Sequence, residues 1–263
     1  MGRILAISSH VARGHVGLAA TVPALQSLGH EVWALPSVVL ASRPGLGRLV
    51  RYALPADDLA ALLAGLEADG CWAELDAVFT GYFPSPQSVA AAAATIGRVR
   101  RAKPGVLVCV DPILGDEGRL YISADTAAAI RDELLPQATV TTPNLFELAW
   151  LTGGAALSSR DVPAAARRLA VPTVAVTSAE LTQGEIATVL LTPSGVCGHS
   201  TPRRAGIPNG AGDLFAGLLL GHLLTEAAAA DAFAKSLRAL DLVLAASEHR
   251  PTLQLAALQA LPS

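Results

Sequence analysis

A glycine-rich run in the C-terminal third of the chain has the composition of a phosphate-binding turn. It reads Asn209-Gly210-Ala211-Gly212-Asp213 and leads into an apolar helical pattern. Two glycines separated by one residue allow backbone N–H groups to converge at a helix start, whose positive end favours phosphate oxygens. Asp213 can then accept the proton of a hydroxyl held beside that phosphate, and phosphoryl transfer needs such a base. The alternative is an ordinary helix start, where an acidic residue is favoured anyway.

A second run, Asp111-Pro112-Ile113-Leu114-Gly115-Asp116, brings two carboxylates close together after an apolar segment. Asp111 ends the strand predicted over 106–110, and Asp116 follows after a turn. Carboxylate oxygens near a phosphate site suit divalent cations that bridge to ATP. An Asp-Pro turn without a ligand is the alternative.

A third run, Thr142-Pro143-Asn144-Leu145-Phe146-Glu147, opens a predicted helix. Asn144 and Glu147 are three residues apart and therefore share a helix face. Glu147 is suited to hold magnesium through water, and Asn144 to contact phosphate. The same pair also has the pattern of a capping box, which needs no ligand at all.

The elements that must position these runs alternate between short apolar strands and helices. We predict strands over 3–7, 31–35, 77–80, 106–110, 139–142, 173–176 and 187–191, the last in a hairpin with 195–200. We predict helices over 18–28, 57–68, 88–102, 124–134, 145–151, 163–169 and 211–224, two more at the C-terminus, and a loop or flap over 37–54. This order indicates a three-layer α/β/α sandwich with a mostly parallel central sheet, as a single domain over 1–263.

In such sheets, ligands bind beyond the carboxyl ends of the strands. Five predicted strands end in polar or glycine-containing turns, which we expect to lie at one edge of the sheet. These turns are 8–10, Gly81-Tyr82, Asp111-Pro112, 142–144 and Thr177-Ser178.

Composition excludes several classes of protein. Hydrophobic residues make up 52% of the 263 residues, but much of this is alanine, and no apolar run reaches the roughly 20 residues of a membrane span. The net charge is -3 with no basic domain, which argues against nucleic acid binding. Three cysteines without C-x-x-C spacing favour reduced thiols over disulfides or zinc. We therefore expect a cytoplasmic protein.

The three runs, in this order, resemble the ribokinase-like superfamily, whose members phosphorylate small alcohols with ATP. The N-terminal stretch from Ser8 to Gly17, SSHVARGHVG, is similar to the opening signature of pyridoxal kinases. Thr80-Gly81-Tyr82 and the run 176–178 follow at that family's approximate spacing. The resemblance covers nearly the whole chain.

For the alcohol substrate, the resemblance implies that Ser9 binds the pyridine nitrogen and that Val16 and Tyr82 pack on the ring. It implies that Asp213 takes the proton of the 5′-hydroxyl while Gly210, Ala211 and Gly212 form the anion hole. Two positions depart from the family. Pro44 stands where relatives carry a substrate-contacting Thr, and Ala211 stands where they often carry Thr.

For the nucleotide and ions, the resemblance implies ATP with Mg²⁺ and a monovalent cation, usually potassium. The residues implied near ATP are Asp111, Asp116, Tyr121, Asn144, Glu147, Thr177, Ser178, Arg203 and Arg204. Those implied near the ions are Asp111, Thr142, Glu147 and Thr177.

The expected reaction is phosphorylation of pyridoxal, with pyridoxine and pyridoxamine as further substrates, by a homodimer. A kinase for hydroxymethylpyrimidine or another small alcohol is the alternative within the superfamily, and the altered position 44 keeps it open. A non-catalytic vitamin B6 binding protein is the alternative of another class; the presence of Asp213 beside the glycine-rich turn argues against it.

Overall fold

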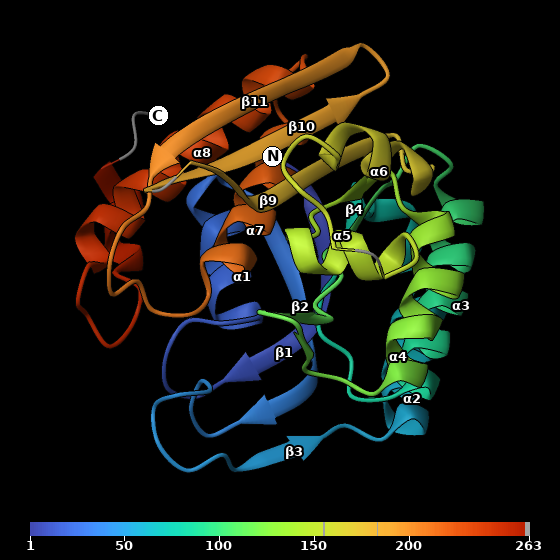
Figure 1. Cartoon of the computed structure of the whole chain (residues 1–263). Coiled ribbons are helices and arrows are strands. Elements are labelled where there is room, and N and C mark those ends of the chain that lie inside the picture. Colours follow the sequence, from blue (N-terminus) through green and yellow to red (C-terminus); the bar gives the residue numbers. More distant parts are fainter. Residues whose placement is uncertain (155, 183, 261–263) are drawn as a thin grey trace.

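The central feature of the computed structural model is a mixed β-sheet that runs through the molecule (Figure 1). The structure describes residues 1–154, 156–182 and 184–260. Within them, one nine-stranded sheet has the order β11-β10-β9-β8-β5-β4-β1-β2-β3. Its strands are β1 (Arg3–Val11), β2 (Glu31–Leu40), β3 (Arg51–Ala53), β4 (Ala77–Thr80), β5 (Leu107–Val110), β8 (Val140–Thr141), β9 (Thr173–Thr182), β10 (Glu185–Thr192) and β11 (Gly195–Pro202). The six neighbouring strands β2, β1, β4, β5, β8 and β9 pair in parallel, whereas β3 pairs antiparallel with β2, β10 with β9 and β11 with β10.

Helices cover both faces of this sheet, which gives the three predicted layers (Figure 1). One face carries α2 (Ala56–Ala68), α3 (Pro86–Ala102), α4 (Ala124–Ala129), α5 (Leu145–Leu151) and α6 (Val162–Arg168). The other carries α1 (Leu18–Ser27), α7 (Ala211–Leu223) and α8 (Ala229–Ser247). A small hairpin of β6 (Gly115–Asp116) and β7 (Arg119–Leu120) stands apart from the main sheet.

The alternation of side chains along the strands explains why both faces need a helical layer. In β1, Leu5 belongs to the core under α2 and α3, whereas its neighbour Ile4 belongs to the core under α1 and α7. Val108 and Cys109 of β5 divide in the same way. Strands that are apolar on both faces are typical of parallel sheets buried between helices.

Three expectations about elements were wrong in extent. β1 and β2 continue to Val11 and Leu40, and β3 lies inside the segment expected to be loop, so that only residues 41–50 connect β2 to β3. After α7, the described residues form one α-helix, α8, and a short 3₁₀ helix over Leu255–Ala260, where two longer helices were expected. In the described part of the chain, no helix combines the length and apolarity needed to cross a membrane.

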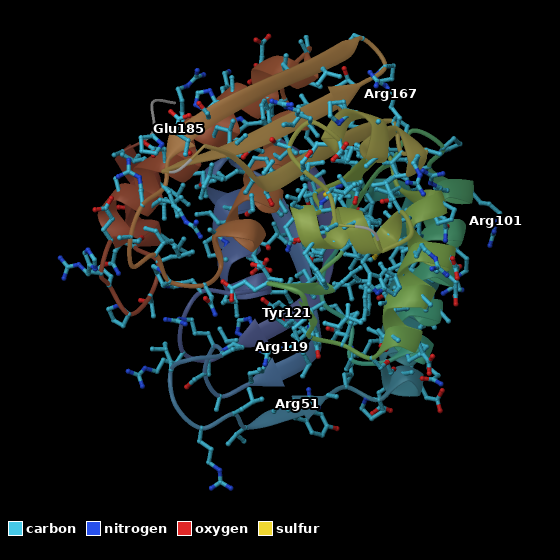
Figure 2. All side chains as sticks on the ribbon, viewed as in Figure 1. Arg51, Arg101, Arg119, Tyr121, Arg167 and Glu185 are labelled. Carbon is cyan, nitrogen blue, oxygen red and sulfur yellow. The ribbon has the colours of Figure 1, made fainter. Side chains whose placement is uncertain are left out.

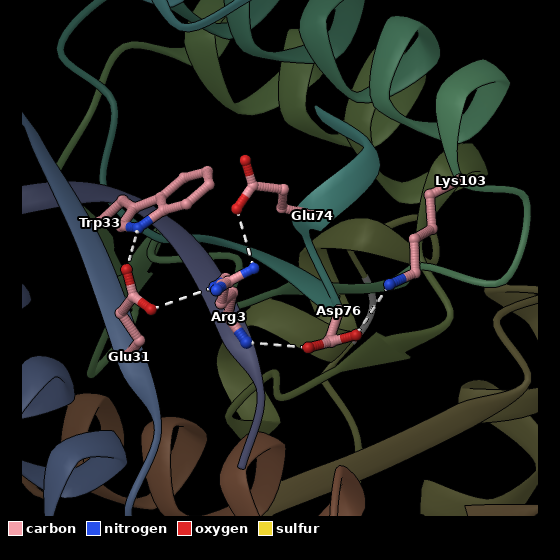
Figure 3. A network of polar contacts seen from close by, with 6 residues as sticks. All are labelled: Arg3, Glu31, Trp33, Glu74, Asp76 and Lys103. Carbon is pink, nitrogen blue, oxygen red and sulfur yellow. Dashed lines mark hydrogen bonds and ion pairs between the residues drawn. The ribbon is translucent and has the colours of Figure 1, made fainter. Parts of the chain in front are cut away.

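An ion-pair network joins the amino ends of the central strands (Figure 3). The guanidinium of Arg3 contacts Glu31 at 3.1 Å and Glu74 at 2.8 Å, while the Arg3 backbone N–H donates to Asp76. Lys103 pairs with the other oxygen of Asp76 at 2.9 Å. These pairs are largely exposed and each contributes little to stability, about 0–1 kcal/mol. The network lies at the amino ends of these strands, opposite the carboxyl ends that the predicted polar turns follow.

Candidate active site

The strand register aligns the predicted polar turns along one edge of the sheet, the one formed by the carboxyl ends of its parallel strands. Ile7 pairs with Thr80, Thr80 with Val110, and Val110 with Thr141. The next residue of each of the four strands therefore lies at the same level. These residues are Ser8, Gly81, Asp111 and Thr142. The fifth turn joins them because Thr177 bridges to Asn144 and donates its N–H to the carbonyl of Pro143 at 3.0 Å. The prediction of a common edge is confirmed.

The backbone of Tyr82 is fixed from two sides at this edge. Its N–H donates to the Ser8 hydroxyl at 3.0 Å, and its carbonyl accepts from the Ser37 hydroxyl at 2.6 Å. Ser37 is free to do this because the β1–β2 register shifts there, pairing Ser8 with Pro36 and Ser9 with Val38. Ser8 and Ser37 are both fully buried. Tyr82, in the turn after β4, therefore lies beside β1, the strand that carries Ser9, and both residues are expected to bind one substrate.

The glycine-rich turn lies against the loop after β1. Gly210 has φ +113° and caps the start of α7, and a β-carbon there would overlap the carbonyl oxygen of His15. Only glycine tolerates both the close approach and this φ without strain. The turn is therefore held beside the loop that carries Val16. The Asp213 carbonyl accepts from the Thr21 hydroxyl at 3.1 Å, which ties α7 to α1.

The carboxyl group of Asp213 is unusual for a helix start. Asp213 is partly exposed as a residue, yet its Oδ1 is buried and accepts no hydrogen bond among the described residues. Burial raises the pKa of Asp213 to about 6, while the backbone N–H groups of Gly17 and of Asp213 itself favour the charged form. At neutral pH the group is largely a carboxylate with a vacant acceptor site, which suits a general base.

Asp111 and Thr142 are in direct contact, as their shared level in the sheet requires. The Thr142 hydroxyl donates to Asp111 Oδ1 at 2.8 Å, and Asp111 is only 6% exposed. Burial and, to a smaller extent, the charge of Asp213 raise the pKa of Asp111 to about 8, against the hydrogen bond from Thr142, which lowers it. Two carboxyl groups that repel each other in this way are typical of functional sites.

Two hydroxyl groups at this level were missed in the sequence. Thr80 and Thr141 each have a buried Oγ1 without a hydrogen-bond partner among the described residues. Each ends its strand, one residue before Gly81 and Thr142 respectively. Threonine at the ends of two strands, β4 and β8, which flank β5, is the signal that would have pointed to them.

Glu147 forms the capping box that its spacing from Asn144 allows. Asn144 Oδ1 accepts the Glu147 N–H, and Glu147 Oε2 accepts the Asn144 N–H, both at 2.8 Å, which is a capping box. Glu147 Oε1 also accepts the N–H groups of Leu114 and Gly115. Burial and the charge of Asp111 raise the pKa of Glu147 well above its ordinary value, although these N–H groups favour the carboxylate. Glu147 therefore holds Leu114 and Gly115, in the loop that begins with Asp111, against the start of α5.

The β6–β7 hairpin carries Asp116 and Tyr121 on the surface. Tyr121 is 53% exposed and lies with Arg119 near the middle of the molecule in Figure 2. Its backbone N–H donates to the carbonyl of Leu114 at 2.7 Å. Partial burial, followed by the charges of Asp116 and Glu147, raises the pKa of the Tyr121 phenol. The hairpin thus stands next to the buried carboxylates.

Other predicted residues divide between this edge and elsewhere. Ser178 follows Thr177 with φ +59°, an uncommon backbone for a non-glycine residue that often marks a functional site. Arg204 instead pairs with Asp241 at 2.8 Å and Glu248 at 2.6 Å, and so is bound to α8 and the segment after it. Among the described residues, no three His, Cys, Asp or Glu side chains form a cluster that could hold a metal alone.

Comparisons with known proteins show the family to which the chain belongs. The phosphomethylpyrimidine kinase family model matches residues 55–254. The pyridoxal kinase PdxY of Deinococcus radiodurans is 37% identical over 250 residues, covering 90% of this chain and 84% of that protein. The pyridoxine/pyridoxal/pyridoxamine kinase of Bordetella avium is 36% identical over 231 residues, covering 85% and 78% respectively. The structure of pyridoxal kinase from Leishmania donovani in complex with ADP and pyridoxamine matches with a TM-score of 0.88 at 25% identity, covering 99% of this chain and 95% of that chain. This chain belongs to the phosphomethylpyrimidine kinase family and, within it, to the pyridoxal kinases.

Proposed function

We propose that this chain transfers the γ-phosphoryl group of ATP to the 5′-hydroxyl of pyridoxal, giving pyridoxal 5′-phosphate and ADP. One observation carries the proposal. A buried carboxylate oxygen of Asp213, without a hydrogen-bond partner in the described structure, stands at the helix start directly after the glycine-rich turn. A binding protein has no need of a vacant, pKa-raised carboxylate beside an anion site, whereas a kinase uses it as a base.

On the vitamin side, Ser9 binds the pyridine nitrogen, Val16 and Tyr82 pack against the ring, and Pro44 covers it from the flap. The oxygen of the 5′-hydroxyl attacks the γ-phosphorus while its proton moves to the Asp213 carboxylate. The bond from the γ-phosphorus to the bridging oxygen breaks, and ADP leaves with that electron pair. Backbone N–H groups of Gly210, Ala211 and Gly212 stabilise the charge on the transferred group.

On the nucleotide side, the proposal uses residues of the same sheet edge and of the β6–β7 hairpin. The residues proposed to contact ATP are Asp111, Asp116, Tyr121, Asn144, Glu147, Thr177, Ser178 and Arg203. The Leishmania donovani kinase bound ADP in a structure that matches this one along 99% of the chain, which supports a nucleotide here. Arg204 is left out because Asp241 and Glu248 already hold its guanidinium.

The buried oxygens suit hard cations. Asp111 and Glu147 are 6% and 5% exposed and carry raised pKa values, and the Thr80 and Thr141 hydroxyls lack partners. We propose that Asp111, Thr142 and Thr177 hold a monovalent cation such as K⁺. Glu147 already accepts three N–H bonds, so it would hold Mg²⁺ through water, alongside the ATP phosphates. When bound, these ions neutralise phosphate charge.

We also propose that the chain forms one kinase domain and assembles as a homodimer.

A hydroxymethylpyrimidine kinase is the second candidate, because the matching family model carries the phosphomethylpyrimidine kinase name. The named relatives above, 36–37% identical, favour the vitamin B6 reaction. Tyr82, whose backbone is fixed by Ser8 and Ser37, supplies a rigid aromatic surface for a pyridine ring.

The test is product formation by the purified chain with ATP, Mg²⁺ and K⁺, offered pyridoxal, pyridoxine, pyridoxamine and hydroxymethylpyrimidine separately. Pyridoxal phosphate formation at a kcat/KM at least tenfold above that for hydroxymethylpyrimidine is the expected result. Preference for the pyrimidine would assign the second candidate. Binding of pyridoxal without consumption of ATP would assign the non-catalytic binding protein. Asp213→Asn serves as the background, because it keeps the shape and removes the base.

A further inference from the structure

Arg43 lies in the flap, defined here as residues 41–50 between β2 and β3, and its guanidinium bridges two segments that are remote in sequence. Nε and Nη2 donate to the carbonyl oxygen of Pro251 at 3.1 and 2.6 Å. Nη1 donates to the carbonyl oxygen of Pro44, its own neighbour, at 2.8 Å. The planar guanidinium presents its donors as a rigid fork, so a single side chain fixes both carbonyl groups at once.

The rest of Arg43 is bound to a third segment, the loop after β1. Its backbone N–H donates to the carbonyl of Arg13 at 2.9 Å. Its aliphatic stem lies on Gly14, where a β-carbon would come within 2.9 Å of Arg43 Cγ. Arg43 thus joins the flap to the loop after β1 on one side and to the C-terminal segment around Pro251 on the other.

All three segments adjoin the glycine-rich turn. The carbonyl of His15, in the loop after β1, lies against Gly210. Leu253, two residues after Pro251, is buried, and its Cδ1 would lie 3.2 Å from a β-carbon on Gly210. Asn209 Nδ2 also donates to the Pro44 carbonyl, at 3.5 Å. The flap is therefore fastened next to the place where the phosphoryl group is proposed to move.

We propose that Arg43 is a positioning residue that holds the flap closed over the alcohol site, and so sets the affinity for the alcohol substrate. The inference rests on the proposed function for the identity of that substrate. Pro44 has no side-chain donor to offer a substrate, and its carbonyl already accepts from Arg43 and Asn209. The flap of this chain therefore acts by covering the site.

Arg43→Ala tests the idea against a matched control, Arg48→Ala. Arg48 lies in the same flap and carries the same charge, and the described structure gives its exposed side chain no hydrogen bond or ion pair. For Arg43→Ala we expect KM for pyridoxal to rise about tenfold, the effect of losing roughly one net hydrogen bond to a charged group. The kcat and KM for ATP should stay within about twofold. Arg43→Lys, which keeps the charge but not the fork, should recover only part of the loss.

Amide hydrogen exchange without any ligand gives a readout that does not depend on the substrate. Ala41, Arg43 and Leu46 donate their N–H groups to Val50, Arg13 and Arg43. Their exchange should speed up about tenfold in Arg43→Ala and stay unchanged in Arg48→Ala, while exchange in β4 and β5 stays slow in both.

Equal exchange in the two alanine variants would overturn the proposal, as would an unchanged KM for the preferred alcohol. If the wild type phosphorylates another alcohol, the proposed function fails, and KM is then measured with that alcohol. The inference about Arg43 is still tested by this KM and by amide hydrogen exchange in the flap. A drop in kcat with KM unchanged would also overturn it, because a cover over the substrate site acts on binding.

Discussion

The backbone of Gly210 lies directly against the carbonyl oxygen of His15, so a β-carbon on Gly210 would overlap that oxygen. This contact joins the glycine-rich turn, which starts α7, to the loop after β1, which carries the residues proposed to bind the vitamin ring. It sets the distance between the two halves of the proposed site without any side chain.

Gly210→Ala is therefore expected to displace the turn. The φ of +113° alone costs of order 1–3 kcal/mol for alanine, and the overlap with His15 adds to it. Loss of anion-hole geometry should lower kcat by about 10²–10³-fold, measured at saturating ATP and pyridoxal.

Gly70→Ala separates the strain of a positive φ from the overlap with the His15 carbonyl. Gly70 also has a positive φ, +77°, but a β-carbon there would meet nothing within 4 Å. We expect a loss of about 1 kcal/mol in the free energy of unfolding and normal kcat. A Gly210→Ala enzyme with normal kcat would show that the turn does not bind the transferred group.

The pH dependence of kcat/KM should report Asp213. Only the carboxylate form accepts a proton, and burial raises the pKa of this group to about 6. Activity should therefore fall tenfold per pH unit below about pH 6, and not near pH 4 as for an exposed carboxyl group.

Asp213→Asn checks the assignment of that limb. We expect kcat to fall by about 10²–10⁴-fold and the residual activity to lose the limb near pH 6. A limb that persists unchanged in Asp213→Asn would assign it to another group, and near-normal kcat would remove Asp213 as the base.

Much of the fold and part of the site could be predicted from the sequence because they depend on local patterns. Apolar runs followed by polar turns located β4 at 77–80 as predicted, and placed Asp111 and Thr142 at the same edge of the sheet. Their hydrogen bond at 2.8 Å follows from parallel pairing of β5 with β8. Such residues are predictable because each needs only its own strand to end at the expected place.

What could not be predicted depends on contacts between distant segments. β1 and β2 extend past Ile7 and Leu35 because they pair with each other through a register shift, which no local pattern encodes. The ion pair of Arg204 with Asp241, 37 residues away in the sequence, is likewise not encoded in any local pattern. The carbonyl of His15 is a backbone group, and any residue at position 15 would supply it.

Glu147→Gln should separate positioning of the nucleotide loop from general stability. Glu147 accepts N–H groups from Leu114, Gly115 and Asn144, and an amide has one acceptor oxygen instead of two. We expect a loss of about 1.5–3 kcal/mol in the free energy of unfolding, measured by denaturant. The KM for ATP of the variant should be higher than that of the wild type.

Glu133→Gln is the control for charge removal, because Glu133 has an exposed side chain on the turn after α4. Its unfolding free energy should lie within about 0.5 kcal/mol of the wild type. If Glu147→Gln behaves like this control, the hydrogen bonds to the loop after β5 do not hold it.

His30 should make the free energy of unfolding depend on pH. The ring is 4% exposed, its Nδ1 accepts the Gly2 N–H at 3.0 Å, and its Nε2 therefore donates to the Gly221 carbonyl at 3.0 Å. Burial lowers its pKa below 6.5, and burial also lowers the pKa of the nearby His222. Both rings are thus neutral when folded but gain a proton when unfolded once the pH falls through 6.5.

The sign follows from proton binding. Because each of these two rings binds more protons in the unfolded chain than in the folded one below pH 6.5, the contribution of each ring to stability falls as pH falls, by at most about 1.4 kcal/mol per pH unit. Urea unfolding of the wild type between pH 7.5 and 5.5 measures this slope. His30→Gln, whose amide can accept from Gly2 and donate to Gly221, should remove the share of His30 and leave that of His222. An unchanged slope in His30→Gln would show that His30 is not the titrating group.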